Sequence, residues 1–223
     1  MSKKVYISPS DQRSNTYAYG NTTEDVQCGK IAQACKVALE RCGIEVMLGQ
    51  YDTMANRCAE SDKFGADLHL PIHTNAYSDP TVAGTRIFCS SFNGEGYKAC
   101  KAIFDVLAPF TPGKSENIKE NPGLFEIKTP KAPTAYVEVD FHSNPSVAKW
   151  IIEHTTEIGE TICKGVCNYF KVPYKTPSTT STTSNTLYRV QIGAFRVKAN
   201  AEAMLKKAKA AGFSDAFITE VKK

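Results

Sequence analysis

Short segments of strand length alternate with longer segments of helical periodicity along most of this chain. The strand-like segments lie at 5–8, 44–48, 66–72, 85–90, 124–127 and 136–141, and the helical segments lie at 23–43, 53–64, 94–107 and 145–170. Such alternation predicts parallel strands joined by right-handed crossovers, with helices on both faces of the sheet. We therefore expect an α/β fold whose sheet is mostly parallel and is flanked by helices on both faces.

One strand-like segment, Tyr136 to Asn144, reads YVEVDFHSN and carries an ionisable side chain at every second position. Because side chains alternate between the two faces of a strand, Glu138, Asp140 and His142 project to one side and apolar residues to the other. Burying such groups is costly unless they bind a metal, take part in a reaction or form a salt bridge. The segment therefore predicts a chemical site, with a simple ion pair to a Lys or Arg as the alternative.

Four candidate functional side chains follow the predicted strands or open the first helix. They are Glu24, His73, Glu138 and His142. In parallel sheets the ligand site lies at the carboxyl ends of the strands, so we expect these four to meet there. A hydrolytic zinc site needs about three ligands from His, Glu and Asp, together with a carboxylate that moves protons. The chain offers both requirements at one edge of the predicted sheet.

Three further polar residues are not expected to bind the metal or the substrate directly. We expect His154 at the surface, and we expect His69 in the core with its hydrogen bonds satisfied. Asp140 is expected to orient a ligand from behind.

Two motifs, ADLHLPIHTNA at residues 66–76 and YVEVDFHSN, together resemble those of N-acetylmuramoyl-L-alanine amidases of the amidase-3 class. GNTTE before the first helix has the matching spacing, and the resemblance covers about residues 4–171. It implies one Zn²⁺ held by Glu24 and His73, with Glu138 as the catalytic carboxylate. In this family the enzyme hydrolyses the amide between the lactyl group of N-acetylmuramic acid and the L-alanine of the peptidoglycan stem peptide.

The chain departs from that family at one zinc ligand. The family usually carries a histidine in a GHGG-like turn after the first strand, and this chain has Pro9-Ser10-Asp11-Gln12 there. Zinc prefers imidazole to an amide oxygen. We expect His142, which stands where the family has an aliphatic residue, to replace the missing ligand, with Asp11 or Gln12 as the alternatives.

Asn75 and Asn144 follow the two motif strands closely. We expect them to bind the sugar or peptide of the substrate, or else to close their own loops. Two other functions stay open at this point. The chain could be a catalytically inert peptidoglycan-binding protein, or a zinc hydrolase of another cell-wall amide.

A Ser/Thr-rich linker at 175–186 separates a catalytic domain at 1–174 from a tail at 187–223. In the tail, YRVQIGAF and NAEAMLKKAKAAGF resemble the opening of a SPOR domain, which binds peptidoglycan glycan strands, and they predict a small β-α-β module. The tail carries eight Lys or Arg and three Asp or Glu. Only about half of the usual module is present. Because half a module leaves a sheet edge uncovered, we expect two tails to pair in a homodimer.

The cysteines and the chain start bear on where the protein is made. Of the eight cysteines, Cys28, Cys35 and Cys42 recur every seven residues and Cys163 and Cys167 are four apart, which indicates reduced core thiols of helices. The chain has no CxxC pair, which argues against a cysteine zinc site. No segment reads as a membrane span or a secretory signal. Together with the resemblance to the amidase family, this implies a phage-type endolysin that is cytoplasmic at synthesis and reaches the cell wall after holin-type release. We expect no nucleic-acid partner.

Overall fold

The computed structural model describes residues 2–49, 53–114, 116–177, 191–213 and 216–220. The chain forms two compact units, Met1–Pro177 and Ser178–Lys223. The division falls inside the segment that composition marks as a linker. No helix among the described residues is both long and apolar enough to cross a bilayer.

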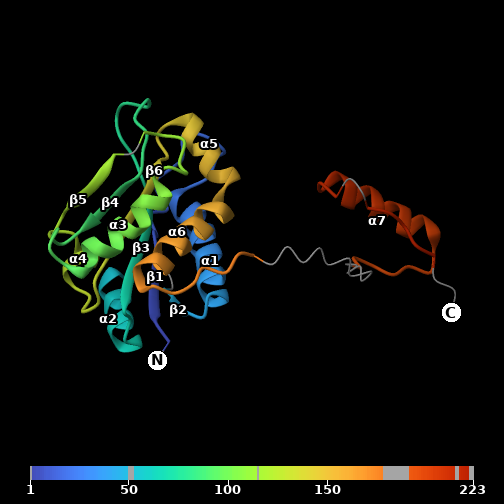
Figure 1. Ribbon diagram of the computed structural model, residues 1–223. Coiled ribbons are helices and arrows are strands. Elements are labelled where there is room, and N and C mark those ends of the chain that lie inside the picture. Colours follow the sequence, from blue (N-terminus) through green and yellow to red (C-terminus); the bar gives the residue numbers. More distant parts are fainter. Residues whose placement is uncertain (1, 50–52, 115, 178–190, 214–215, 221–223) are drawn as a thin grey trace. The chain divides into compact units, whose positions relative to one another are not determined.

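A six-stranded sheet forms the centre of the first unit (Figure 1). Its strands are β1 (Lys4–Pro9), β2 (Glu45–Leu48), β3 (Leu68–Asn75), β4 (Arg86–Cys89), β5 (Asn117–Glu120) and β6 (Tyr136–Phe141). They lie in the order β2-β1-β3-β6-β4-β5. Neighbouring strands are parallel except β4 and β6, which pair antiparallel. The predicted α/β fold with a mostly parallel sheet is therefore confirmed.

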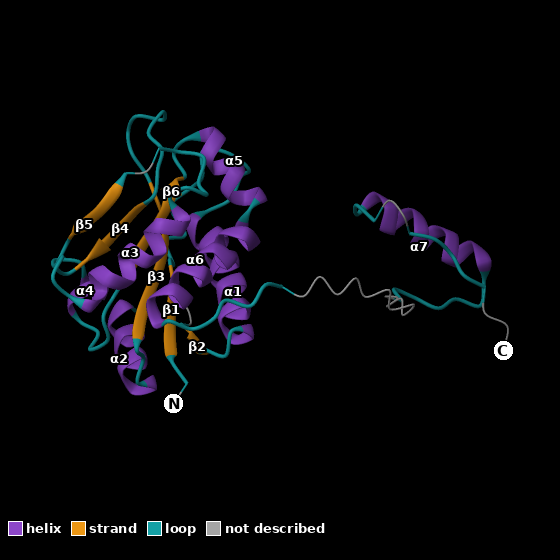
Figure 2. Cartoon of the chain, viewed as in Figure 1, coloured by secondary structure: helices purple, strands orange, loops and turns teal. Residues whose placement is uncertain are grey.

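Helices cover both faces of this sheet (Figure 2). They are α1 (Glu24–Arg41), α2 (Met54–Phe64), α3 (Glu95–Leu107), α4 (Phe125–Lys128), α5 (Pro145–Glu153) and α6 (Thr155–Phe170). Val5 and Ile7 of β1 face α1 in the main core, whereas Tyr6 between them donates to Glu60 of α2. Strand alternation therefore assigns α1, α3 and α6 to one face and α2 to the other.

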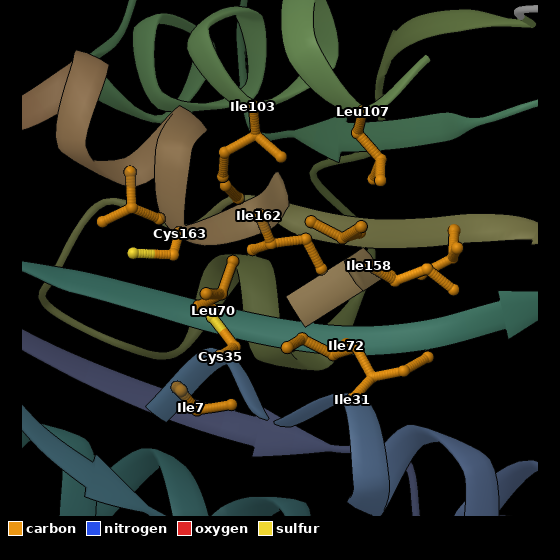
Figure 3. Packing of buried hydrophobic residues seen from close by; sticks show 14 of the residues in the cluster. Ile7, Ile31, Cys35, Leu70, Ile72, Ile103, Leu107, Ile158, Ile162 and Cys163 are labelled. Atoms are coloured by element: carbon orange, nitrogen blue, oxygen red, sulfur yellow. The ribbon is translucent and has the colours of Figure 1, made fainter. Parts of the chain in front are cut away.

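The main core lies between the sheet and the helices α1, α3 and α6 (Figure 3). Ile158 and Ile162 of α6 lie between the β3 residues Leu70 and Ile72 and the α3 residue Ile103. All five side chains are fully buried. Burying a side chain of this size contributes about 1.5–3 kcal/mol, so this layer fixes β3 against its covering helices.

Three local features differ from the sequence-based expectation. Strand β4 runs antiparallel to β6, and the segment expected as a strand at 124–127 is mostly the short helix α4. The strand next to β4 at this edge of the sheet is instead β5, which pairs with β4 in parallel. The single helix expected at 145–170 is broken at His154, whose backbone leaves the helical region at φ −124° and ψ 22°.

The opposite face of the sheet carries a buried polar network. His69 Nδ1 lies 3.0 Å from Ser61 Oγ, and its Nε2 lies 3.3 Å from Glu126 Oε1. The ring stacks on Tyr6 with a centroid separation of 5.3 Å. The prediction that His69 is a satisfied core histidine is therefore confirmed.

The second unit contains one described helix, α7 (Lys198–Ala210). It is followed by Gly212 at φ +99°, as expected for a glycine that stops a helix. The flanking strands of the expected β-α-β module do not form at 191–192 or 216–220, and residues 188–190 and 221 lie outside the described residues. A strand needs a second strand to pair with, whereas the backbone hydrogen bonds of helix α7 lie within the helix itself.

Gly165 tests the contact between α3 and α6. A Cβ atom there would lie 2.5 Å from the Ile103 Cα, so a side chain would force the two helices apart. We expect Gly165→Ala to lower the free energy of unfolding by about 2 kcal/mol in chemical denaturation, despite the better helix propensity of alanine. The control is Gly94→Ala, whose Cβ would meet no atom closer than 3.8 Å. Equal stability of the two variants would contradict this packing.

Candidate active site

Two ionisable side chains face each other at the centre of the sheet. His73 of β3 and Glu138 of β6 are direct partners in the strand register, and Arg86 of β4 is the partner of Glu138 on its other side. An imidazole, a carboxylate and a guanidinium therefore lie in one row across three strands. Regular pairing of β3 with β6 ends at this row, because the register of the two strands shifts between His73 and Asn75.

Glu24 reaches the same row from the first turn of α1. Its Oε1 lies 2.9 Å from His73 Nδ1, and its Oε2 accepts a hydrogen bond of 2.8 Å from Asn15 Nδ2. The Glu24 backbone N–H donates to the Asn15 carbonyl at 2.9 Å. A carboxylate at a helix N-terminus is also favoured by the helix dipole. The helix start and the Asn15 loop thus hold Glu24 against His73.

Glu24 and His73 stabilise each other's charged form. Burial raises the pKa of Glu24, but the hydrogen bond and charge of His73 more than offset this effect, and the pKa lies below its ordinary value. Burial lowers the pKa of His73, but the hydrogen bond to Glu24 and the charge of Glu138 raise it above its ordinary value. Without a metal, the two side chains therefore form a buried ion pair.

The pKa of Glu24 is lowered, whereas the pKa of Glu138 is raised. Burial raises its pKa to about 7, although the charges of His73 and Arg86 oppose the shift. A carboxyl group with this pKa is partly ionised at neutral pH and can both accept and return a proton. This is the property that a general acid and base requires.

The site combines buried polar atoms that lack a partner with one pair of ligand atoms at a spacing that suits a metal ion. Within the described residues, the buried atoms His73 Nε2 and Glu138 Oε2 have no hydrogen-bond partner. The 2.9 Å between Glu24 Oε1 and His73 Nδ1 is close to the spacing of about 3.3 Å between two ligands on tetrahedral zinc. The carboxylate and imidazole therefore fit the Zn²⁺ that the sequence predicts.

His142, the expected third ligand, lies with a different set of residues. Its Nδ1 is 3.0 Å from the Thr74 carbonyl oxygen and 2.9 Å from Thr74 Oγ1. Its ring stacks on Tyr17 with a centroid separation of 4.9 Å. Among the described side chains, Glu24, His73 and His142 do not bring three ligand atoms within 4.8 Å of one another. The structure thus leaves His142 as a predicted ligand that is not assembled with the other two.

The two alternative ligands differ in position. Gln12 lies at the site, because its Nε2 is 3.4 Å from His73 Nδ1 and its Oε1 accepts from Asn15 at 2.7 Å. The Asp11 carboxylate instead faces the Arg57 guanidinium at 3.6 Å. Of the two, Gln12 is the one that contacts a predicted zinc ligand.

The predicted substrate-binding asparagines make local hydrogen bonds. Asn144 caps α5 by accepting from the backbone N–H groups of Ser146 and Val147, and Asn75 Oδ1 accepts from the next N–H at 2.9 Å. Asp140 accepts from the backbone of Gly84 at 2.6 Å and so holds a neighbouring loop, not a ligand as expected. Substrate binding by Asn75 and Asn144 stays a prediction.

Sequence reasoning missed three contributors to this site. Arg86 and Tyr136 frame the row, since Arg86 opposes Glu138 and the Tyr136 ring stacks on His73 at 4.7 Å. Asn15 bridges Gln12 and Glu24. Period-two alternation places Tyr136 on the Glu138 face, but nothing in the sequence reveals that β4 is the neighbour of β6.

Comparison with known proteins agrees with this geometry. Residues 5–168 match the N-acetylmuramoyl-L-alanine amidase family, and residues 171–223 match the SPOR domain. The chain therefore belongs to the N-acetylmuramoyl-L-alanine amidase family, and it is an amidase. The predicted family resemblance is confirmed.

One relative is similar to this chain in sequence, and two solved structures are similar to it in fold. The chain is 26% identical over 226 residues to the sporulation-specific N-acetylmuramoyl-L-alanine amidase of Bacillus subtilis (strain 168), covering 94% of this chain and 82% of the relative. Its fold is similar to the amidase AmiC2 of Nostoc punctiforme, with a TM-score of 0.70 and 17% identity over 76% of this chain and 97% of that one. The amidase of Clostridium difficile 630 gives a TM-score of 0.69 and 21% identity, over 76% of this chain and 97% of that one.

The raised pKa of Glu138 predicts how the stability of the metal-free chain depends on pH. In the unfolded chain this carboxyl group loses its proton near pH 4.5, and in the folded chain it does so near pH 7. Between these values the unfolded chain binds fewer protons, so stability falls as the pH rises. We expect the native chain to lose about 2 kcal/mol relative to Glu138→Gln between pH 5 and pH 8 in urea denaturation. Parallel pH profiles would contradict the shift.

Proposed function

We propose that this amidase hydrolyses the bond between the lactyl group of N-acetylmuramic acid and L-alanine in peptidoglycan, using one Zn²⁺ held by Glu24 and His73. The observation that carries the proposal is the meeting of three side chains: Glu24 from the start of α1 contacts His73 of β3, and His73 is the register partner of Glu138 of β6. Family membership supports the same substrate.

The zinc ion, Glu138 and Arg86 would have different roles in the reaction. When bound, zinc supplies Lewis acidity that polarises the scissile carbonyl and makes water more acidic. Glu138 would accept the proton of the attacking water and deliver it to the leaving amine of L-alanine, a role that its place beside His73 and its unpartnered Oε2 support. The Arg86 charge favours the ionised form of Glu138 and so keeps it available as a base.

The third protein ligand is the open part of this proposal. We propose His142, as the sequence predicts, and this requires its ring to leave Thr74 and Tyr17 when the metal binds. Gln12 is the alternative supported by position: its Nε2 lies beside His73, and its ligand atom Oε1 would have to leave Asn15 Nδ2 to bind the metal. The ligand preference of zinc favours the His142 imidazole as third ligand, whereas distance from His73 favours the Gln12 amide.

Three variants test the site through zinc content and wall hydrolysis. We expect Glu138→Gln to retain one zinc while wall hydrolysis falls at least 100-fold, because the base is lost and the ligands remain. We expect His142→Ala to lose zinc and Gln12→Ala to keep it. The matched control is His154→Ala, which removes a partly exposed histidine stacked on Trp150 outside the site.

The outcomes of this test are separable. Zinc retained by His142→Ala and lost by Gln12→Ala would move the third ligand to Gln12. Full activity in Glu138→Gln would contradict the catalytic role of that carboxylate. Mass spectrometry of the digested walls must show peptides with a free L-alanine amino group, and a different new terminus would contradict the proposed bond.

The tail is proposed to bind peptidoglycan glycan strands and to pair two chains. The SPOR match and the excess of basic residues support the first part. The second is supported by large apolar side chains that are exposed around α7. They are Ile192, Phe195, Val197, Phe213, Phe217 and Ile218. Exposed apolar side chains in such number are typical of a surface that another protein covers.

Sedimentation of the full chain tests the homodimer. We expect a dimer at micromolar concentration, and a monomer when Phe213 and Phe217 are both changed to Ser, because they are 63% and 71% exposed in the single chain. The control Val37→Ser removes an apolar side chain of 51% exposure from the first unit and should leave the dimer intact. A native chain that sediments as a monomer would rule out the pairing.

We also propose a phage-type lytic role with synthesis in the cytoplasm and holin-dependent release. All eight cysteines are free and buried, which suits synthesis in a reducing compartment. We expect cells that make the chain in the cytoplasm to lyse when a holin is co-expressed and to stay intact without it. The Glu138→Gln variant with holin is the control. Turbidity loss at the same rate without holin would contradict this role.

A further inference from the structure

Three cysteines converge at the far end of α1 from the amidase site. Cys42 is the C-cap residue of α1, and Cys163 and Cys167 lie one turn apart on α6. Glu24 begins the same helix, which has 18 residues and so spans about 27 Å. The cluster therefore belongs to a different part of the domain from the amidase centre.

The sulfur atoms have the spacing of ligands around one metal ion. Cys42 Sγ lies 3.9 Å from Cys163 Sγ, and Cys163 Sγ lies 3.9 Å from Cys167 Sγ. All three sulfurs lie within 4.8 Å of one another, and all three residues are buried. Tetrahedral zinc with zinc–sulfur bonds of about 2.3 Å holds two sulfur ligands about 3.8 Å apart. The three thiols need little movement to hold such an ion.

One backbone N–H group already donates to the cluster. The Lys175 backbone N–H donates to Cys42 Sγ at 3.3 Å, as N–H groups do in metal–thiolate sites, and the Arg41 side chain lies at the cluster's edge. All three cysteines are free thiols, so a bound metal ion would displace their protons.

A second group of potential ligands, Cys58, His69 and Glu126, does not have these properties. Both ring nitrogens of His69 are already paired, and Glu126 accepts from Ser8 Oγ. The Arg57 guanidinium lies 3.9 Å from the Glu126 carboxylate and would repel a cation there. That group is a satisfied structural network, whereas within the described part of the chain the hydrogen bonds of the three thiols are with one another and with the Lys175 backbone.

We propose that Cys42, Cys163 and Cys167 form a second metal site, for one thiophilic divalent cation of the Zn²⁺ and Cd²⁺ class. Soft thiolate ligands select such ions. The spacing of cysteines along the sequence argued against a cysteine site, but packing of α1 against α6 assembles ligands that are 121 residues apart. A bound ion ties the end of α1 to α6 and to the Lys175 backbone, where the first unit ends.

Cadmium binding to the reduced, metal-free full chain tests the site. Cd²⁺ bound to thiolates absorbs in the ultraviolet by charge transfer, and the carboxylate and imidazole of the amidase centre give no such band. We expect the band to saturate at one Cd²⁺ per chain. It should be lost, or need at least tenfold more Cd²⁺, in Cys42→Ala and Cys167→Ala. It should persist in Glu24→Ala and in the matched control Cys100→Ala, which removes a buried helical cysteine outside the cluster.

A measurement on the native chain covers the case in which a variant fails to fold. With Cd²⁺ bound, we expect Cys42, Cys163 and Cys167 to resist alkylation in mild denaturant while the other five cysteines react, as read by peptide mass spectrometry. The absence of a charge-transfer band in the native chain would overturn the proposal. Equal alkylation of all eight cysteines with and without Cd²⁺, or a band that survives in folded Cys42→Ala, would overturn it as well.

Discussion

The pairing of β3 with β6 is the constraint on which the site depends. It sets His73 opposite Glu138 in the middle of the sheet, where neither side chain can be fully solvated. Burying two ionisable groups is unfavourable unless each has a partner. Glu24 satisfies His73 from one side, and Arg86 moderates the charge of Glu138 from the other. The apolar layer of α3 and α6 on the opposite face keeps these strands in register.

This arrangement gives the carboxylates of Glu24 and Glu138 different properties. Glu24 is held in its ionised form by His73 and Asn15, as a metal ligand must be. Glu138 is partly exposed as a residue, but its Oε2 is buried and unpartnered, and desolvation raises the pKa of this carboxyl group to about 7 in the metal-free chain. Two groups of the same chemistry therefore differ because of their surroundings, and the difference supplies a ligand and a base within one row of residues.

The sequence predicted the parts of this structure that depend on local patterns. Period-two alternation placed Glu138 opposite the apolar residues of its strand, and helical periodicity with Gly43 predicted α1 with little error. The parts it missed depend on which elements become neighbours. Arg86 enters the site only because β4 lies antiparallel beside β6. His142 was expected near His73, but its ring follows Thr74 toward Tyr17 after the strand ends.

Anomalous diffraction from crystals of the zinc-loaded chain would test the central claim most directly. The account predicts a zinc peak bound by both the Glu24 carboxylate and the His73 imidazole, with the Glu138 carboxylate beside the ion but outside its ligand shell. No zinc peak between Glu24 and His73, or a peak there with Glu138 as a ligand, would contradict the division of roles between the two carboxylates.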